Sequence, residues 1–205
     1  MNIGIFGGSF DPIHEGHANL AKYVLDHTDL DEVWLMVSPL NPLKPQGYVA
    51  TNEQRLEMAR LAVEGIPGIR VSDFEFHLPI PSYTYKTLTE LKKSYPDHDF
   101  RLIIGGDNWA DFDKWKNPDE ILKEFSIIIY PRPNESIIPS TQNPTYNTQN
   151  VTILDNAPKM PISSTQIRHL LASQQPDLKH ASSSLPLNQK VSTYIHIHSL
   201  YQSPL

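Results

Sequence analysis

Two histidines lie three residues apart in a glycine-rich segment near the start of the chain, which reads GGSFDPIHEGH over residues 7–17. The two glycines follow an apolar run, so the backbone can approach a ligand closely and offer N–H groups to a phosphate. At the start of a helix, the rings of His14 and His17 can point to one side. Together with the positive end of that helix, they favour an anion whose charge changes during a reaction. Spacing alone also allows a tight turn with two helix-capping histidines.

A second segment, ISSTQIR over residues 162–168, combines hydroxyl groups with an arginine. Ser163 and Gln166 have the spacing of a capping box, which predicts that a helix begins here. Free backbone N–H groups, the hydroxyls and Arg168 in the first turn would form a second anion site. The alternative is a well-capped helix with a solvated arginine.

Other glycine-rich motifs do not fit the first segment. The chain has no G-K-[ST] sequence, so this is not a P-loop, and Gly4, Gly7 and Gly8 do not form G-x-G-x-x-G. Position 11 is Asp rather than Gly, which excludes a nucleophile elbow centred on Ser9.

Apolar runs alternate along the chain with segments of helical periodicity, and this alternation predicts the elements that position both motifs. The predicted strands are residues 1–6, 32–38, 69–76, 100–104, 126–130 and 151–154. Helical patterns cover residues 20–25, 84–95, 119–125, 165–172 and 187–201, and another helix follows a cap at Thr51 or Asn52. Residues 134–150 are polar and predict a long surface loop.

This order of elements predicts an α/β protein with a Rossmann-like, doubly wound parallel sheet. We expect a single domain over residues 1–205, with a small C-terminal helical part at about 163–205. Such sheets bind ligands beyond the carboxyl ends of their strands, and the glycine-rich turns after the first and fourth strands both lie at that edge.

The composition narrows the classes of partner. The chain has 205 residues, no cysteine, and 17 basic against 23 acidic residues, for a net charge of −6. The absence of a basic run argues against nucleic acid, whereas a small phosphorylated ligand needs only a few local cations. No run approaches the roughly 20 apolar residues of a membrane helix, and the start of the chain does not read as a signal peptide. We therefore expect a cytoplasmic protein without a membrane partner; the oligomeric state, including a homo-oligomer, stays open.

Taken together, the two motifs resemble the HxGH and ISSTxIR signatures of the nucleotidyltransferase superfamily. Within it, the chain is most similar to bacterial nicotinate mononucleotide adenylyltransferases. The resemblance spans nearly the whole chain, and its further matches are NPLK at 41–44, PSYTYKTL at 81–88, IIGGD at 103–107, Trp115 and Arg132-Pro133.

The resemblance implies a role for each matched residue. The first motif would hold the ATP phosphates through Gly8, Ser9, Phe10, His14 and His17. The second would grip the outgoing pyrophosphate through Ser163, Ser164, Thr165 and Arg168. Adenosine would contact Gly105 and Asp107, the mononucleotide phosphate would meet Lys44 with Asn41 nearby, and the pyridine ring would lie against Thr84, Tyr85 and Trp115.

The implied reaction moves AMP from ATP onto the phosphate of nicotinate mononucleotide. That phosphate is largely dianionic at neutral pH, with a second pKa near about 6, and needs no general base. His14, His17, Lys44 and Arg168 would stabilise the spreading charge, with Mg²⁺ carried on the ATP phosphates rather than in a protein cage. The alternatives are a phosphopantetheine adenylyltransferase, which shares the first motif, a glycerol-phosphate cytidylyltransferase, and a non-catalytic nucleotide sensor.

Other conspicuous residues have structural interpretations. Asp73 and Glu75 alternate along the third predicted strand, and we expect them to face solvent or a loop rather than to form an acid pair. His196 and His198 would diverge on the predicted C-terminal helix, which argues against a metal pair. Trp34 is expected in the core.

Overall fold

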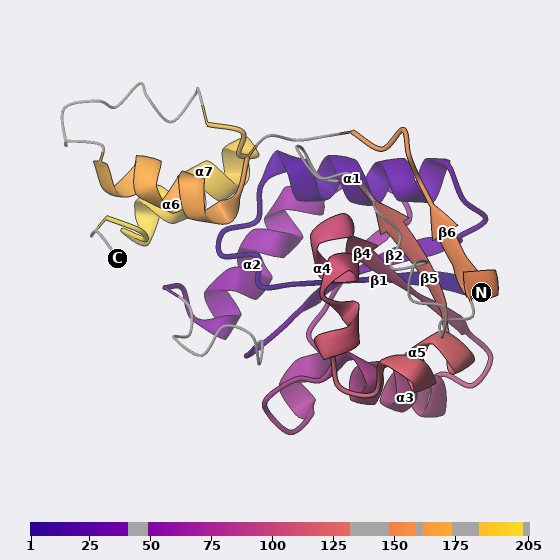
Figure 1. Ribbon diagram of the computed structural model, residues 1–205. Helices are drawn as coiled ribbons and strands as arrows, with labels where there is room; N and C mark the ends of the chain where they lie inside the picture. Colours follow the sequence, from indigo (N-terminus) through magenta and orange to yellow (C-terminus); the bar gives the residue numbers. More distant parts are fainter. Residues whose placement is uncertain (41–48, 132–147, 159–161, 174–184, 203–205) are drawn as a thin grey trace.

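The computed structural model describes residues 1–40, 49–131, 148–158, 162–173 and 185–202. Its centre is a parallel sheet with strand order β3-β2-β1-β4-β5-β6, flanked by helices (Figure 1). The strands are β1 Asn2–Gly8, β2 Glu32–Val37, β3 Ile69–Ser72, β4 Asp99–Gly105, β5 Ser126–Tyr130 and β6 Val151–Ile153. The predicted α/β class and Rossmann-like sheet are confirmed.

The strand order reverses between β1 and β4, which are neighbours in register from Asn2 with Asp99 to Phe6 with Ile103. The chain winds outward from this pair in both directions, so the connections leave a crevice beyond the carboxyl ends of β1 and β4. Gly7 and Gly8 at the end of β1 and Gly105 at the end of β4 lie at this crevice. The fold thus brings two predicted phosphate- and nucleotide-binding segments to one edge.

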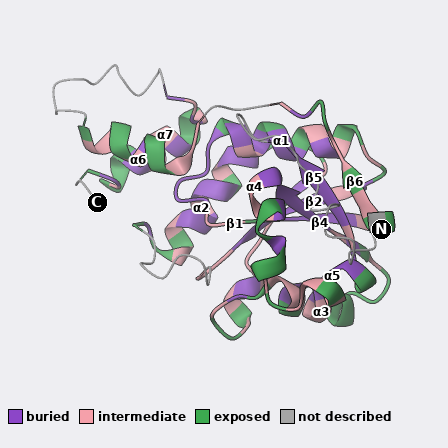
Figure 2. Ribbon diagram, viewed as in Figure 1, coloured by how far each residue is buried: buried purple, intermediate pink, exposed green. Residues whose placement is uncertain are grey.

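Helices cover both faces of the sheet and build two apolar clusters (Figure 2). The first cluster joins β1, β4 and β5 to α1, α2, α6 and α7, and the second joins the opposite face to α3, α4 and α5. The central strands are buried on both faces, which explains why their sequences are almost continuously apolar. Trp34 lies in the second cluster, as expected. The helices are α1 Glu15–Asp26, α2 Asn52–Val63, α3 Thr84–Ser94, α4 Gly106–Ala110, α5 Pro118–Glu124, α6 Ser164–Ser173 and α7 Gln189–Ile197.

Helix starts follow the capping residues in the sequence. Thr51 caps α2, because its hydroxyl accepts from the Gln54 N–H (3.2 Å) while the Gln54 side chain accepts from the Thr51 N–H (2.9 Å). The same reciprocal pair forms between Ser163 and Gln166 at α6, at 3.2 and 2.8 Å. The predicted capping box is therefore confirmed.

One predicted strand is wrong in its second half. The strand over residues 69–76 ends at Ser72, and the chain turns into the 3₁₀ helix η1, Phe74–His77. Glu75 is consequently buried, contrary to the expectation that it faces solvent or a loop. Two short elements were not predicted, α4 and the 3₁₀ helix η2, Phe112–Lys114. Of the predicted loop at 134–150, residues 134–147 lie outside the described residues, and Thr148–Asn150 forms the 3₁₀ helix η4.

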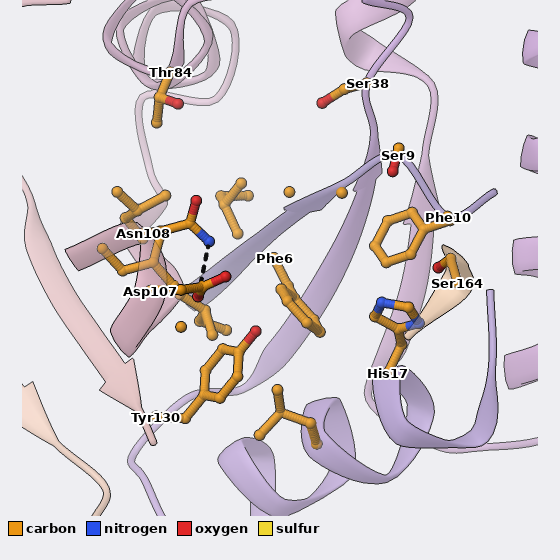
Figure 3. A pocket seen from close by; sticks show the side chains of 18 of the residues that line it. Phe6, Ser9, Phe10, His17, Ser38, Thr84, Asp107, Asn108, Tyr130 and Ser164 are labelled. Carbon is orange, nitrogen blue, oxygen red and sulfur yellow. Dashed lines mark hydrogen bonds between the residues drawn. The ribbon is translucent and has the colours of Figure 1, made fainter. Parts of the chain in front are cut away.

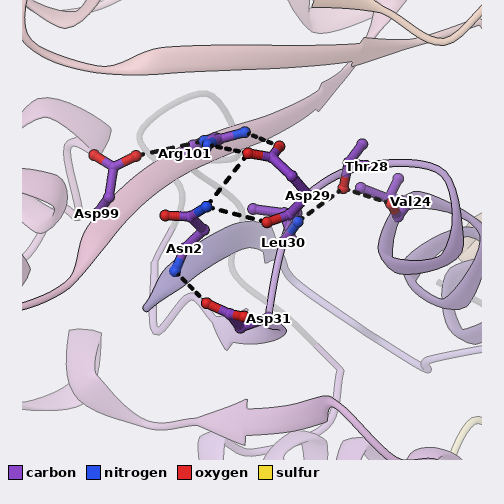
Figure 4. Close-up of polar contacts among 8 residues, drawn as sticks. All are labelled: Asn2, Val24, Thr28, Asp29, Leu30, Asp31, Asp99 and Arg101. Carbon is purple, nitrogen blue, oxygen red and sulfur yellow. Dashed lines mark hydrogen bonds and ion pairs between the residues drawn. The ribbon is translucent and has the colours of Figure 1, made fainter.

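The amino ends of β1 and β4 are fastened by a polar cluster on the edge opposite the crevice (Figure 4). Arg101 donates to both carboxylate oxygens of Asp29, at 2.5 and 2.9 Å, and the Asn2 N–H donates to Asp31 at 2.7 Å. The hydrogen bond from Arg101 lowers the pKa of Asp29 below its ordinary value. These carboxylates are engaged in holding strands together.

Within the residues that the structure describes, no helix has the length and apolar character needed to cross a membrane.

The second apolar cluster sets the position of α3 and can be tested at Leu91, a fully buried residue on that helix. Leu91→Ala should lower the free energy of unfolding by about 2–5 kcal/mol, because it removes apolar burial and leaves a cavity. Leu170→Ala is the matched control, since Leu170 is 45% exposed, and should change stability by less than about 0.5 kcal/mol. Urea unfolding measures both, and equal effects would contradict this description of the core.

Candidate active site

The turn after β1 adopts a backbone conformation that only strong local contacts can hold. Phe10 has φ of +48°, in the left-handed region, at a cost of about 1–3 kcal/mol. Its buried ring lies over Gly8, where an added Cβ would come within 2.7 Å of the ring. Gly8 is therefore required by this close approach, and the Phe10 ring forms one wall beside His17 at 5.1 Å between centroids.

The Asp11 side chain holds this turn through hydrogen bonds with distant segments of the chain. Its buried carboxylate accepts the backbone N–H groups of Val49 (3.0 Å) and Ala50 (3.1 Å) and the hydroxyl of Tyr201 (2.7 Å). Arg168 lies 4.0 Å from the same carboxylate. We call Asp11 with these four residues the Asp11 centre.

Tyr201 within the Asp11 centre and Arg55 beside it complete the support. Burial, followed by the nearby Asp11 charge, raises the pKa of Tyr201 far above its usual value, so its hydroxyl stays a donor. Arg55, fully buried on α2, donates to the Ser9 carbonyl oxygen at 2.5 Å and to Asn52 at 2.7 Å. The turn is thus anchored on both sides of Phe10.

The predicted histidine pair forms at the start of α1. His14 is the N-cap residue, and its ring lies 3.8 Å from that of His17 between centroids, tilted by 35°. The His14 N–H donates to Nδ1 of His17 at 3.3 Å. Because Nδ1 is an acceptor here, the neutral ring carries its proton on Nε2 and can donate from that atom. Both histidines line the cleft described below.

Helix α1 offers fewer backbone donors to an anion than the sequence predicts. The Glu15 N–H donates to the Pro186 carbonyl oxygen at 2.9 Å, and the His17 N–H donates to the His14 carbonyl oxygen at 2.9 Å. Two N–H groups of the first turn are therefore used inside the protein. The imidazole rings carry more of the predicted anion contact than the helix backbone does.

The second motif is joined directly to the first. The Ser164 hydroxyl donates to the Pro12 carbonyl oxygen at 2.9 Å, and Arg168 donates to the Asp11 carbonyl oxygen at 2.6 Å. Arg168 also donates to the Thr165 hydroxyl at 3.2 Å. Segments more than 150 residues apart in sequence thus face one space, with the first turn of α6 opposite His17 (Figure 3).

These segments surround a cleft of about 720 Å³ at the carboxyl ends of the strands. Most of the predicted site residues line it together: Gly8, Ser9, Phe10, His14, His17, Thr84, Gly105, Asp107, Trp115, Ser163, Ser164, Thr165 and Arg168. Asn41 and Lys44 lie outside the described residues, so their predicted roles stay predictions.

The structure does not bring the side chain of Tyr85 to this lining. On α3, Thr84, Thr87 and Leu88 share the face toward the cleft, since residues three and four apart lie on one side of a helix. Tyr85 lies on another side, and its hydroxyl donates to Glu124 on α5 at 3.0 Å. A role for its ring in the site does not fit this geometry. A role for its backbone N–H in the first turn of α3 stays a prediction.

The far end of the cleft combines aromatic and amide groups. Phe6 and Tyr130 lie 5.9 Å apart between ring centroids, and Asp107 accepts from the Asn108 side chain at 3.3 Å (Figure 3). The two rings are nearly perpendicular, at 78°. An aromatic surface with an adjacent carboxylate and amide suits a purine, which offers both a ring face and polar edges.

Several lining residues were not singled out from the sequence. Lys114 and Lys116 bring two exposed cations beside Trp115, and Tyr130 follows β5. Glu75 is buried at the other side, where burial raises the pKa of its carboxyl group and the Thr87, Ser38 and Ser82 hydroxyls partly oppose that shift. The lysines could have been noticed as charges flanking a predicted contact residue, whereas no local pattern marks Glu75.

Comparisons with known proteins agree with this geometry. A family model described as cytidylyltransferase-like matches residues 5–170. A protein of Bacteroides fragilis named probable nicotinate-nucleotide adenylyltransferase is 52% identical over 169 residues, covering 82% of this chain and 81% of its own. One of Flavobacterium johnsoniae with the same name is 38% identical and covers 98% of this chain and all of its own.

Solved structures share the fold. A Plasmodium falciparum nicotinic acid mononucleotide adenylyltransferase complexed with APC superimposes with a TM-score of 0.80 and 22% identity, over 99% of this chain and 98% of that one. The same enzyme complexed with NaAD gives 0.79 at 21% identity, with the same coverage.

The fold and the joined motifs are those of a cytidylyltransferase-like nucleotidyltransferase. Within that class, the chain belongs to the nicotinate-nucleotide adenylyltransferase family, as the sequence motifs predict.

The Asp11 centre can be tested by removing one hydroxyl group. Tyr201→Phe should lower the free energy of unfolding by about 1–3 kcal/mol, because the buried Asp11 carboxylate loses a donor. Tyr194→Phe is the control: within the described residues, the Tyr194 hydroxyl makes no hydrogen bond, and its loss should cost less than about 0.5 kcal/mol. Chemical denaturation compares the two, and equal stabilities would contradict a structural role for the Asp11–Tyr201 hydrogen bond.

Proposed function

We propose that the chain transfers the adenylyl group of ATP to the phosphate of nicotinate mononucleotide, giving nicotinate adenine dinucleotide and pyrophosphate. The observation that carries this proposal is the direct joining of the two anion-binding motifs through Ser164 and Arg168 at the strand ends. Thr84 and Trp115 line the same cleft on the side of α3 and η2. The cleft can thus receive a nucleoside triphosphate and a second, smaller ring system.

The mononucleotide phosphate is the nucleophile. One of its oxygens attacks the α-phosphorus of ATP and forms the new P–O bond, while the bond from that phosphorus to the bridging oxygen of the β-phosphate breaks. Pyrophosphate leaves with the electron pair of the broken bond. The protein therefore needs to align the two phosphates and stabilise charge, and no side chain has to act as nucleophile.

The charge on the phosphates is met by side chains already held in place. His17 donates from Nε2, His14 lies beside it, and Arg168 reaches in from α6. The hydrogen bonds of His17 with the His14 N–H and of Arg168 with the Asp11 carbonyl oxygen orient these side chains before the substrate arrives, so little reorganisation is needed as charge develops. Lys44 is proposed to hold the mononucleotide phosphate.

Magnesium fits this donor set as an ion that arrives with ATP. In the described part of the chain, no three His, Asp or Glu side chains lie together as a metal site. Mg²⁺ keeps several waters and is bound largely through substrate phosphates, which here would be held by His14, His17 and Arg168. When bound, the ion neutralises phosphate charge.

The start of α3 is proposed to recognise the pyridine carboxylate. Within the described residues, no side chain caps the first turn of α3, whose N-cap residue is Tyr83, and Thr84 of that turn lines the cleft. A negative charge at a helix N-terminus gains about 0.3–1 kcal/mol or more, which favours a carboxylate over a neutral amide. Trp115 would lie against the ring. A cytoplasmic location, where both substrates occur, is part of this proposal.

The substrate assignment is tested by incubating the purified protein with ATP, Mg²⁺ and one acceptor at a time. Pyrophosphate release and dinucleotide formation should be rapid with nicotinate mononucleotide and slow with the nicotinamide form. Turnover with phosphopantetheine alone would support the proposed phosphate chemistry and show that nicotinate mononucleotide is not the acceptor. Tight ATP binding without turnover of any acceptor would instead indicate a nucleotide sensor.

His17→Ala tests the phosphate machinery. Loss of one transition-state donor should reduce kcat by about 10²–10³, while the circular dichroism spectrum stays that of the native protein. His196→Ala is the control, because His196 is exposed on α7, and should retain full activity. A folded His17→Ala variant with normal turnover would disprove the role.

A further inference from the structure

Glu75 is a buried acidic residue for which the adenylyl transfer itself has no use. Only 6% of its surface is exposed, and it lies in η1, on the side of the cleft away from the phosphate motifs. Burying a carboxyl group in a protein is unfavourable unless hydrogen bonds compensate it. An apolar side chain would fill the same space without that cost, so the carboxyl group itself requires an explanation.

The hydrogen-bond partner of Glu75 is a hydroxyl group on α3. Oε1 accepts a hydrogen bond from the Thr87 hydroxyl at 2.8 Å, and Thr87 is itself buried in the first turns of α3. Ser38, directly after β2, and Ser82, just before α3, counteract the effect of burial on the pKa of the carboxyl group. Glu75 therefore joins η1 to the start of α3, the helix that carries Thr84.

A backbone contact extends this connection toward the predicted phosphate-binding loop. The Ser82 N–H donates to the Leu40 carbonyl oxygen at 3.2 Å. Leu40 immediately precedes residues 41–48, which carry Asn41 and Lys44. The segments around Glu75 thus lead toward both predicted contacts of the pyridine nucleotide.

We propose that Glu75 is a positioning residue for the pyridine-nucleotide half of the cleft, fixing the start of α3 against η1 through Thr87. This inference rests on the proposed function, because it names the half of the substrate pair that the Glu75 contacts serve. The N–H groups in the first turn of α3 must lie within hydrogen-bond distance of the pyridine carboxylate. A loosened α3 therefore weakens use of the mononucleotide and leaves use of ATP intact.

The test compares two threonines of α3. Thr87→Val removes the hydroxyl that Glu75 accepts from and keeps the side-chain shape. Thr89→Val is the matched control, since the Thr89 hydroxyl donates to the Tyr85 carbonyl oxygen of its own helix at 2.8 Å. Thr87→Val should raise the KM for nicotinate mononucleotide about tenfold or more, with the KM for ATP unchanged. Thr89→Val should change neither value.

Substitutions at Glu75 complete the set. Glu75→Gln should retain a nearly normal KM for the mononucleotide, because the amide oxygen still accepts from Thr87, whereas Glu75→Leu should behave like Thr87→Val. An unchanged KM for the mononucleotide in Thr87→Val, or equal increases in both KM values, would overturn the positioning role. Normal kinetics of the variants beside an active wild type would refute this inference alone, and an inactive wild type would refute the proposed function.

A measurement without substrate tests the positioning role independently of the proposed function. The amide of residue 87, which donates to the Tyr83 carbonyl oxygen at 3.0 Å, should be less protected from hydrogen exchange in Thr87→Val than in the wild type and in Thr89→Val, because the start of α3 opens more often. Exchange equal to the wild type would overturn the positioning role whatever the activity of the enzyme.

Discussion

The buried carboxylate of Asp11 is the contact on which the geometry of the phosphate site depends. It accepts from the Val49 and Ala50 backbone and from Tyr201, and it lies beside Arg168. A buried charge is tolerated only where donors and an opposite charge surround it. Satisfying Asp11 therefore brings Val49 and Ala50, Tyr201 and the arginine of α6 together at the turn after β1.

The fixed geometry of this turn explains how the site can act by aligning the substrate phosphates. The left-handed backbone at Phe10 is unfavourable by itself, and it persists because Asp11 and Arg55 hold the residues on either side. Once the turn is fixed, the His14–His17 pair and Arg168 face the same cleft without further adjustment. The start of α3 is held by a different buried carboxyl group, that of Glu75, through Thr87.

The sequence was sufficient for features that depend on local pattern. Continuous apolar runs marked buried parallel strands, Thr51 and Ser163 marked helix starts, and the two motifs marked the cleft. Features that depend on distant partners were missed. Tyr201 meets Asp11 across 190 positions, and the five residues of α4 are too few to show periodicity. Glu75 was placed wrongly because its strand was continued past Ser72, and the phase of α3, set by packing on α5, turns Tyr85 away.

The central claim is that the protein aligns two phosphates and forms no covalent intermediate. The most direct test uses ATP made chiral at the α-phosphorus by sulfur and oxygen isotopes, followed by determination of the configuration in the dinucleotide product. A single in-line displacement by the mononucleotide phosphate predicts inversion of configuration. Retention would require two displacements through an adenylylated side chain and would contradict the account.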